Sequence, residues 1–305
     1  MNRSNDAGVA RAIHGSPWLP YALIGPAALY LLLFQGLPLL QELRLSVSHT
    51  SLLDAAAFRF AGAANFTELF NDPTFLSSLR ITALYVASCV AGTVGLGLGA
   101  ALLMNRSFPG RPIARSLLIV PWAAPPVAVA MIATWMFNAQ YGVINRALGP
   151  FAPPYGQWLD SPSLALVAIL AVTIWQLFPF TAVVILAALQ SVPQDLREAA
   201  VIDGAGLWMR FRVVVWPVIA ATVGLLALLM TIWSIRRFEL IWLMTQGGPV
   251  GTTNTLVIDL YRRGFVLHEL GKAAAVGIVG LAFSLGVTMI YFIVTERLAK
   301  AGPSA

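Results

Sequence analysis

Six stretches of 23 to 34 residues contain no Asp, Glu, Lys or Arg, and they constrain the fold of this 305-residue chain more than any motif does. A helix needs about 20 mostly apolar residues to cross a membrane. Hydrophobic residues make up 58% of the chain and charged residues 10%, whereas soluble domains are about 25% charged. The sequence therefore predicts a polytopic membrane protein. The same composition excludes a disordered chain, a disulfide-rich secreted module and a collagen-like fibre.

The predicted fold class is all-α with six transmembrane helices, because backbone groups in hydrocarbon must satisfy their own hydrogen bonds. A membrane barrel would show shorter segments of alternating polarity, and the run 164–174 does not alternate. The membrane domain would cover 18–296, between tails at 1–17 and 297–305. Its predicted spans are 18–40, 81–104, 116–137, 164–189, 213–244 and 273–294, with a cytoplasmic loop at 190–212.

The distribution of Lys and Arg predicts the orientation. With six spans, both termini share one side with the loops at 105–115 and 190–212, and these segments carry ten of the 19 cations. The other side carries nine over more residues, five of them between Arg236 and Lys272. We therefore expect a multi-pass membrane protein with both termini in the cytoplasm.

No constellation for covalent chemistry is visible in the sequence. The single Cys89 lies in a predicted span, and the three histidines are scattered, so no metal-ligand spacing exists. A Walker loop is absent, since Gly271-Lys272 lacks the upstream glycine. The net charge of +6 comes without a basic stripe interleaved with aromatics, so no nucleic-acid partner is expected. We predict that the chain is not an enzyme and holds no metal or cofactor.

Glycines and prolines inside the spans predict close packing and bends. Gly95 and Gly99 have the spacing that lets helices approach closely. Prolines free carbonyl groups and bend helices. They occur at Pro121, Pro125, Pro126 and Pro179.

The loop at 190–212 predicts a helix–turn–helix unit. Pro193 is placed to open a helix, and Asp195 and Glu198 support its start. Asp203-Gly204 is a helix-stop signal. Leu207, Phe211 and Val214 then form one apolar face. A connector between two membrane helices rarely needs so many residues, which indicates a docking surface for another protein.

This loop resembles the EAA loop of ABC-importer permeases, the coupling helix that docks on a cytoplasmic ATPase. Downstream residues from Phe238 to Ala275 and upstream residues from Phe60 to Thr82 resemble the carbohydrate-uptake branch of that family, over about 20–296. The resemblance implies a second permease subunit, two ATPase subunits that bind ATP and Mg²⁺, and an external solute-binding protein or lipoprotein. The residues that it assigns to ATPase coupling are Glu198, Ala199, Ala200, Asp203, Gly204, Ala205 and Phe211.

The expected substrate path contains Trp175 and Gln176 in the fourth span and Arg236, Arg237 and Glu239 in the fifth. If 213–244 is one long helix, the two arginines lie at membrane depth, where a charge facing lipid is costly. Arg236 and Glu239 share a helix face and are expected to form an ion pair. Arg237 is then the freer group for substrate hydroxyls or a phosphate. In the alternative interpretation, both arginines extend to the outer interface.

Two other functional classes remain as alternatives. A secondary transporter would show inverted repeats, and a membrane-embedded enzyme would bring acids, His or Cys together at a membrane face. The sequence alone does not choose among disaccharides, oligosaccharides, polyols and glycerophosphodiesters as the substrate.

Overall fold

The computed structural model describes residues 18–54 and 58–300, and within these ranges the regular structure is helical. The described residues contain no strand, only isolated bridges between Ser48 and Phe60 and between Ser51 and Asp54. The all-α prediction is therefore confirmed. The longer helical elements are α2 (Leu19–Leu31), α3 (Leu37–Ser46), α4 (Ala64–Asn71), α5 (Pro73–Asn105), α6 (Arg111–Ala123), α7 (Pro126–Met136), α9 (Ala165–Gln190), α10 (Gln194–Ile202), α12 (Trp216–Ile235) and α15 (Leu270–Lys300).

Shorter elements connect these helices and complete several of them. A π-helical turn, η1 (Leu32–Gly36), joins α2 to α3, and another, η4 (Phe211–Val215), leads into α12. The remaining short elements are α8 (Val143–Leu148), α11 (Leu207–Arg210), α13 (Glu239–Thr245), α14 (Leu256–Tyr261), η5 (Arg262–Val266) and two 3-10 turns at Gly149–Phe151 and Pro154–Gly156.

Within residues 18–54 and 58–300, five helical segments are long and apolar enough to cross a membrane, or six if the bent pair α6–α7 counts as one span. This agrees with the polytopic membrane fold expected from the charge-free stretches. The helix predicted at 164–189 is α9, which begins and ends within one residue of that range. The single segments are Tyr21–Ser46, Pro73–Asn105, Ala165–Gln190, Leu207–Ile235 and Leu270–Ile293.

Several helices extend beyond the charge-free stretches because capping, not charge, sets their ends. α5 begins at Pro73, well before the predicted residue 81. Asp72 caps it, since its carboxylate accepts a hydrogen bond of 2.8 Å from the Thr74 amide, and proline at the first position suits a helix start. The first span likewise continues past Glu42 to Ser46.

The third predicted span, 116–137, is wrong as a single helix. α6 ends at Ala123 and α7 begins at Pro126, and the two axes differ by 94°. Ala124 and Pro125 both have extended backbone conformations, with ψ angles of 136° and 132°. Each of these residues precedes a proline, and a residue in that position is disfavoured in the α region. The Pro125-Pro126 pair therefore breaks the span instead of bending it gently.

The fifth predicted span, 213–244, is also wrong as one helix. α12 ends at Ile235, and its C-cap Arg236 has φ −90° and ψ 4°. α13 starts a separate short helix at Glu239. The break falls on Arg236 and Arg237, so these residues occupy a junction between two helices and not the outer half of a continuous one.

α5 and α9 pack along each other more extensively than any other pair of elements. Their contact is close because Gly97 faces α9: a Cβ there would lie 2.0 Å from Thr181 Oγ1 and 3.1 Å from the Ala182 amide nitrogen. The predicted pair Gly95 and Gly99 does not serve this contact, since added Cβ atoms would meet nothing within 4 Å. The sequence therefore pointed to the helix that makes the close contact, α5, but the glycine that faces α9 is Gly97.

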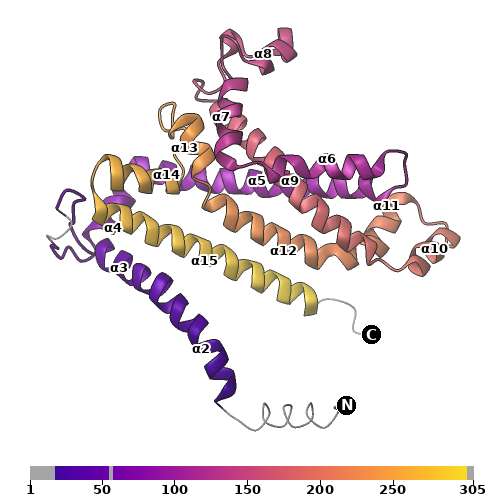
Figure 1. Cartoon of the computed structure of the whole chain (residues 1–305), viewed down its shortest axis with the longest axis horizontal. Helices are drawn as coiled ribbons and strands as arrows, with labels where there is room; N and C mark the ends of the chain where they lie inside the picture. The colour runs from indigo at the N-terminus through magenta and orange to yellow at the C-terminus, as the bar shows by residue number, and fades with distance from the viewer. Residues whose placement is uncertain (1–17, 55–57, 301–305) are drawn as a thin grey trace, which may run out of the picture.

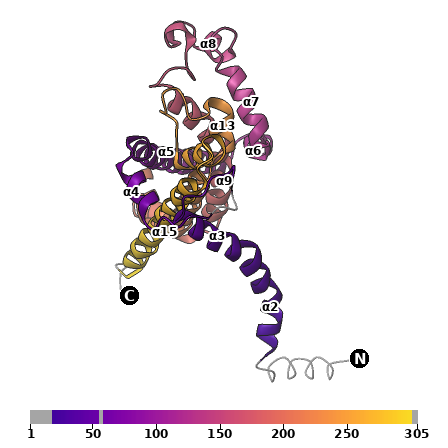
Figure 2. The same cartoon turned by 90° about the vertical axis from the view of Figure 1, so that its left-hand side faces the viewer.

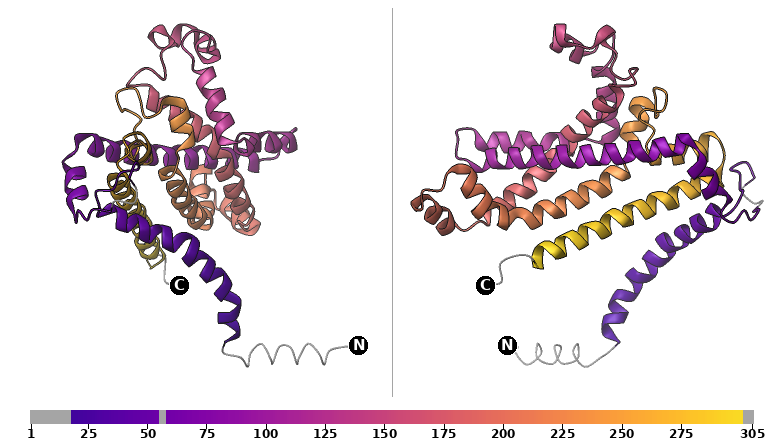
Figure 3. Two further views of the ribbon diagram at one scale, coloured as in Figure 1. Left: turned by 60° about the vertical axis from the view of Figure 1, so that its left-hand side comes forward. Right: turned by 180° about the vertical axis from the view of Figure 1, so that it is seen from behind.

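The two ends of the bundle carry different elements (Figure 1). α10 and α11 lie at one end, toward which the turn between α5 and α6 and the C-terminal part of α15 also point, and Figure 3 shows the same arrangement from behind. α4 and the segment that leads into α15 lie at the other end. α7 and α8 rise away from the bundle, and α2 projects from it on its own (Figure 2).

Candidate functional site

The coupling unit, which we define as residues 194–210, has the helix–turn–helix form expected from the sequence. Pro193 precedes α10 with φ −56° and ψ 134°, and Gln194 donates a 2.6 Å hydrogen bond to Glu198. After Ile202 the chain turns at Gly204, whose φ is +72°. The Ala205 amide bonds the Ala200 carbonyl at 3.0 Å, which closes the helix end.

Most side chains of the coupling unit are exposed, whereas Arg197 and Arg210 are half-buried. Glu198, Ala199, Asp203 and Gly204 are exposed, and Ala200 and Ala205 are half-buried. Large apolar side chains are exposed beside them, among them Ile202 at 85% and Trp208 at 72%. An apolar surface of this kind marks an interaction site. It therefore fits the docking surface predicted from the sequence.

Phe211 differs from the other residues assigned to coupling. It is half-buried and packs against the core formed around Ile185, Leu189 and Ile219. Its ring also stacks on Trp208 at 5.8 Å. Phe211 thus anchors the base of the coupling unit and does not contribute to its outer surface.

A second polar site lies where the two broken helices meet, and we call Ala124, Gln176 and Arg237 the polar junction. Gln176 is 3% exposed on α9. Its amide nitrogen donates to the carbonyl of Ala124 at 3.1 Å, and its oxygen accepts a hydrogen bond from Arg237. The single side chain of Gln176 therefore connects the α6–α7 break to the α12–α13 break.

The other residues expected in the substrate path take no part in the hydrogen bonds of the polar junction. Trp175 is 49% exposed and borders an apolar cavity between α7 and α9. Arg236 and Glu239 are exposed, and neither belongs to any ion pair among residues 18–54 and 58–300. The predicted Arg236–Glu239 ion pair is therefore wrong, because the break in the helix removes their common face. Arg237, expected to be the freer group, is the one that has a side-chain partner.

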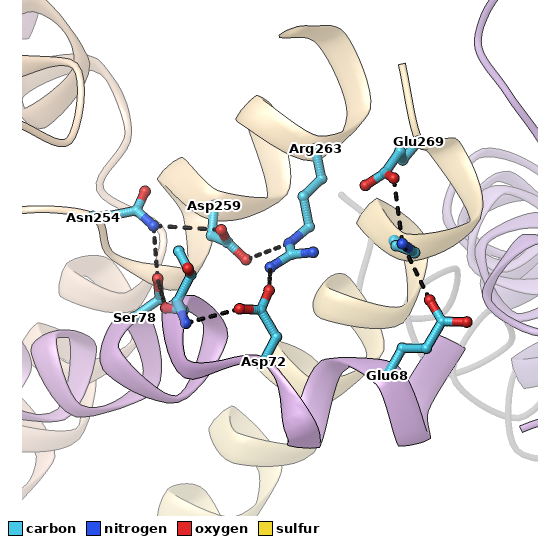
Figure 4. A network of polar contacts seen from close by, with 9 residues as sticks. Glu68, Asp72, Ser78, Asn254, Asp259, Arg263 and Glu269 are labelled. Atoms are coloured by element: carbon cyan, nitrogen blue, oxygen red, sulfur yellow. Dashed lines mark hydrogen bonds and ion pairs between the residues drawn. The ribbon is translucent and has the colours of Figure 1, made fainter. Parts of the chain in front are cut away.

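A buried ionic cluster at the opposite end of the bundle was not predicted (Figure 4). Arg263 bonds Asp72 at the start of α5 and Asp259 one turn earlier, the latter at 2.8 Å. Asn254 extends the cluster to Ser78 at 2.7 Å. Lys272 bonds Glu68 at 3.1 Å and Glu269 at 3.3 Å close by. The local signals for this cluster are the i,i+4 spacing of Asp259 and Arg263 and the i,i+3 spacing of Glu269 and Lys272.

The cluster accounts for part of the cation excess between Arg236 and Lys272. Arg263 and Lys272 are paired with acids, and so do not act as free topology signals. Burial alone would raise the pKa of Asp72, but hydrogen bonds from Arg263 and the Thr74 amide outweigh burial and hold that pKa below its ordinary value. Burial opposes the charge on Arg263, yet Asp72 and Asp259 raise its pKa. Both shifts favour the charged forms of Asp72 and Arg263.

No group of three or more His, Cys, Asp or Glu side chains that could hold a metal ion exists within the described part of the chain. The coupling unit offers an apolar surface with acids at its margin, and the polar junction offers a guanidinium at a helix break.

Comparison with known proteins gives a consistent picture. Residues 93–300 match the family model described as the binding-protein-dependent transport system inner membrane component. The sulfoquinovosyl glycerol transport system permease protein of Agrobacterium fabrum is 34% identical over 277 residues, covering 91% of this chain and 90% of that protein. The trehalose/maltose transport system permease protein of Thermococcus litoralis is 30% identical over 273 residues, with coverages of 90% and 92%.

A solved structure confirms the fold independently. A chain of the bacterial alginate ABC transporter, crystallised in complex with an alginate pentasaccharide-bound periplasmic protein, superposes with a TM-score of 0.80. It is 22% identical, and the match covers 94% of this chain and 96% of that one. Because the family model matches most of the chain and relatives match almost all of it, the chain belongs to the family of binding-protein-dependent transport system inner membrane components, the permeases of ABC transporters.

Proposed function

We propose that this chain is one of two permease subunits of an ATP-driven importer and that it forms half of the path for a sugar or sugar-like solute. The coupling unit is the observation that carries this proposal, since an exposed helix–turn–helix with apolar side chains projects from one end of a membrane bundle. The substrate class is supported by relatives named for trehalose/maltose, sulfoquinovosyl glycerol and sn-glycerol-3-phosphate transport.

The coupling unit docks on an ATPase subunit, and ATP and Mg²⁺ bind to two such partner subunits and not to this chain. Ile202 and Trp208 supply apolar contact area, while Glu198 and Asp203 are available to basic groups of the partner. Arg197, on α10, bonds the Leu189 carbonyl at the end of α9 at 2.6 Å. A movement of α10 driven by the ATPases is thereby passed to a membrane helix. The chain itself carries out no covalent chemistry.

The polar junction lines the solute path. Arg237 and Gln176 offer donors and an acceptor at a point where two helices are interrupted, and interrupted helices bring polar backbone to a path inside a membrane. Such groups suit hydroxyls or a phosphate, and the exposed Trp175 offers a ring face for a sugar. Disaccharides, oligosaccharides, polyols and glycerophosphodiesters all have this chemistry.

The end of the bundle that carries the coupling unit faces the cytoplasm, because ATP is there. This orientation also places both termini and the 105–115 segment in the cytoplasm of a cell with its permease in the inner membrane. The ionic cluster around Arg263 then lies on the external side, where an external solute-binding protein delivers its ligand.

Reconstituted transport tests the proposal. The chain, its partner permease and the ATPase subunits are placed in proteoliposomes with ATP inside and the ligand-loaded binding protein outside. Solute accumulation that requires both ATP and the binding protein is expected. Accumulation driven by an ion gradient without ATP would favour a secondary transporter, and release of a chemically altered solute would favour an enzyme.

A further inference from the structure

A groove of about 660 Å³ opens at the base of the coupling unit. It lies among the C-terminal ends of α5 and α9, the Arg197 side chain of α10, and the α11–η4 segment. Trp208, Arg197 and Phe211, which also serve the coupling unit, line it together with residues of α5 and α9. Its lining combines an apolar floor with an arginine rim, and the two parts point to one class of ligand.

The floor of the groove is apolar and belongs to candidate membrane spans. Leu98 and Leu102 come from the last turns of α5, and Val214 and Val215 come from the π-helical turn before α12. All four belong to segments that are long and apolar enough to span a membrane. An apolar floor built from such segments is suited to an acyl chain, the abundant apolar partner of a membrane protein.

The rim of the groove is cationic. Arg106, Arg197 and Arg210 line it, and no Asp or Glu is among its lining residues. The Nε atoms of Arg197 and Arg210 are buried and have no hydrogen-bond partner among the residues that the structure describes. A buried donor without an acceptor costs free energy, so the rim is suited to an anionic oxygen.

Neighbouring contacts hold this rim in place and limit the competing negative charge. Helix C-termini carry partial negative charge, and the ends of α5 and α9 both reach the groove. The Met104 carbonyl accepts hydrogen bonds from Arg111 at 2.9 Å and from Arg115 at 3.1 Å, and the Leu189 carbonyl accepts one from Arg197. These hydrogen bonds satisfy two carbonyl groups at the C-terminal ends of α5 and α9 and place further cations beside the groove.

We propose that the groove binds one anionic phospholipid, with its phosphate among Arg106, Arg197 and Arg210 and an acyl chain along the apolar floor. Arginine pairs well with phosphate oxygens, and basic pockets between membrane helices at the cytoplasmic face bind anionic headgroups. A soluble anion would not need the floor, and a docked soluble protein would not reach it. The leaflet assignment rests on the proposed function, which places the coupling unit in the cytoplasm.

The bound lipid would connect the coupling unit to the bundle. Arg197 belongs to α10 and Arg210 to α11, whereas Arg106 directly follows α5. One phosphate shared by these residues fixes α10 and α11 relative to α5. ATP-driven uptake should therefore be higher in membranes that contain anionic lipid.

Native mass spectrometry of the assembled transporter tests the site directly. The complex is exchanged into a mixture of phosphatidylglycerol and phosphatidylcholine, and retained lipid is counted. One retained phosphatidylglycerol per copy of this chain is expected. The double variant Arg106→Gln/Arg210→Gln should bind it about tenfold or more weakly, because each charge-assisted hydrogen bond contributes more than the 1.4 kcal/mol that a factor of ten requires.

Two further variants keep the test decisive. Arg212→Gln is the matched control, since Arg212 is exposed on the same turn and does not line the groove. It should retain the lipid. Leu102→Trp fills the floor and should release the lipid while the arginines remain, which covers the case in which the double variant fails to assemble. Equal retention of the two lipids, or unchanged retention in Leu102→Trp, would overturn the proposal. Lipid is counted by mass, so this result is independent of whether the transporter moves sugar.

Discussion

Arg237 donates a hydrogen bond to the side-chain oxygen of Gln176, a residue 61 positions earlier in the chain. The side-chain amide nitrogen of Gln176 also donates a hydrogen bond to the carbonyl of Ala124. Ala124 and Arg237 lie in the two breaks that interrupt α6–α7 and α12–α13. The buried side chain of Gln176 therefore connects the two helix breaks. A solute or a conformational change that breaks the hydrogen bond between Arg237 and Gln176 would remove this connection.

The first prediction concerns Arg237→Ala. This change leaves the buried oxygen of Gln176 without its donor, a loss of about 1–3 kcal/mol, and removes the guanidinium from the proposed path. We expect a lower melting temperature in detergent and a raised half-saturating solute concentration in uptake assays at matched expression.

Arg236→Ala is the control for this prediction, because Arg236 is exposed and forms no ion pair in the described structure. It should leave uptake close to wild type. If Arg237→Ala leaves both the half-saturating concentration and the maximal rate unchanged, Arg237 has no role in the path.

The sequence predicts those parts of the fold that depend on local signals. α9 was placed to within one residue because its apolar run is uninterrupted, and α10 was placed by Pro193 and by the stop signal at Gly204. However, the length of a stretch without charged residues does not show whether its helix is straight or broken. A stretch that turns by 94° at Pro125-Pro126 has the same composition as a straight one, and so 116–137 was predicted as a single helix. The span 213–244 was predicted to continue through Arg236 and Arg237 because apolar residues resume at Leu240.

The ionic cluster was missed because its contacts are remote in sequence. Arg263 and Asp72 are 191 residues apart, and Asn254 and Ser78 are 176 apart. Nothing near Asp72 in the sequence indicates a partner, and its visible role is only that of a helix cap. The coupling unit was recognisable because all its defining contacts lie within about one helix turn of each other along the chain.

The contact between α5 and α9 gives a second prediction. A methyl group at Gly97 would lie 2.0 Å from Thr181 Oγ1, and that hydroxyl is held by a 2.7 Å bond to the Thr93 carbonyl. Gly97→Ala should therefore separate the helices, with a cost of about 1–3 kcal/mol for overpacking, and lower the melting temperature of the detergent-solubilised protein.

Gly95→Ala is matched to that variant, since it is on the same helix and an added methyl group meets nothing within 4 Å. It should leave the melting temperature unchanged or slightly raised, because alanine favours the helix. Equal effects of the two variants would contradict the packing of α5 on α9.

The ionic cluster predicts a pH dependence of stability. The pKa of Asp72 is lowered in the folded protein, so as the pH falls the unfolded chain takes up the proton first. The stabilisation from Asp72 is thus complete above the ordinary pKa of about 3.9 and is lost as the pH falls through the lowered value. Asp72→Asn should reduce the melting temperature at pH 7.

The difference between wild type and Asp72→Asn should stay constant from about pH 8 to 5 and shrink below about pH 4, following that titration. Asp160→Asn, at an exposed position, serves as the reference for a general effect of removing a carboxylate. A difference that grows on acidification would have the wrong sign for an Asp72 held ionised by Arg263.

The orientation can be tested by labelling. With the buried Cys89 changed to serine, a single cysteine at the exposed Ser107 should be labelled by a membrane-impermeant maleimide only in inside-out vesicles. A single cysteine at Val250, which is 94% exposed near the opposite end of the bundle, should react on intact cells. Labelling of the Ser107 position from outside would reverse the proposed topology.

The last prediction distinguishes an effect of backbone conformation from an effect of steric clash at two glycines of the coupling unit. Gly204 has φ +72° and Gly206 has φ −67°, and a Cβ at either position would meet nothing within 4 Å. A residue other than glycine in the left-handed region costs about 1–2 kcal/mol. Gly204→Val should therefore displace the turn and reduce both solute uptake and the ATP hydrolysis stimulated by the binding protein, whereas Gly206→Val should be tolerated. Gly204→Asn should retain part of the activity, because asparagine enters this region more easily. Normal uptake with normally stimulated ATP hydrolysis in Gly204→Val would show that the turn does not position the coupling unit.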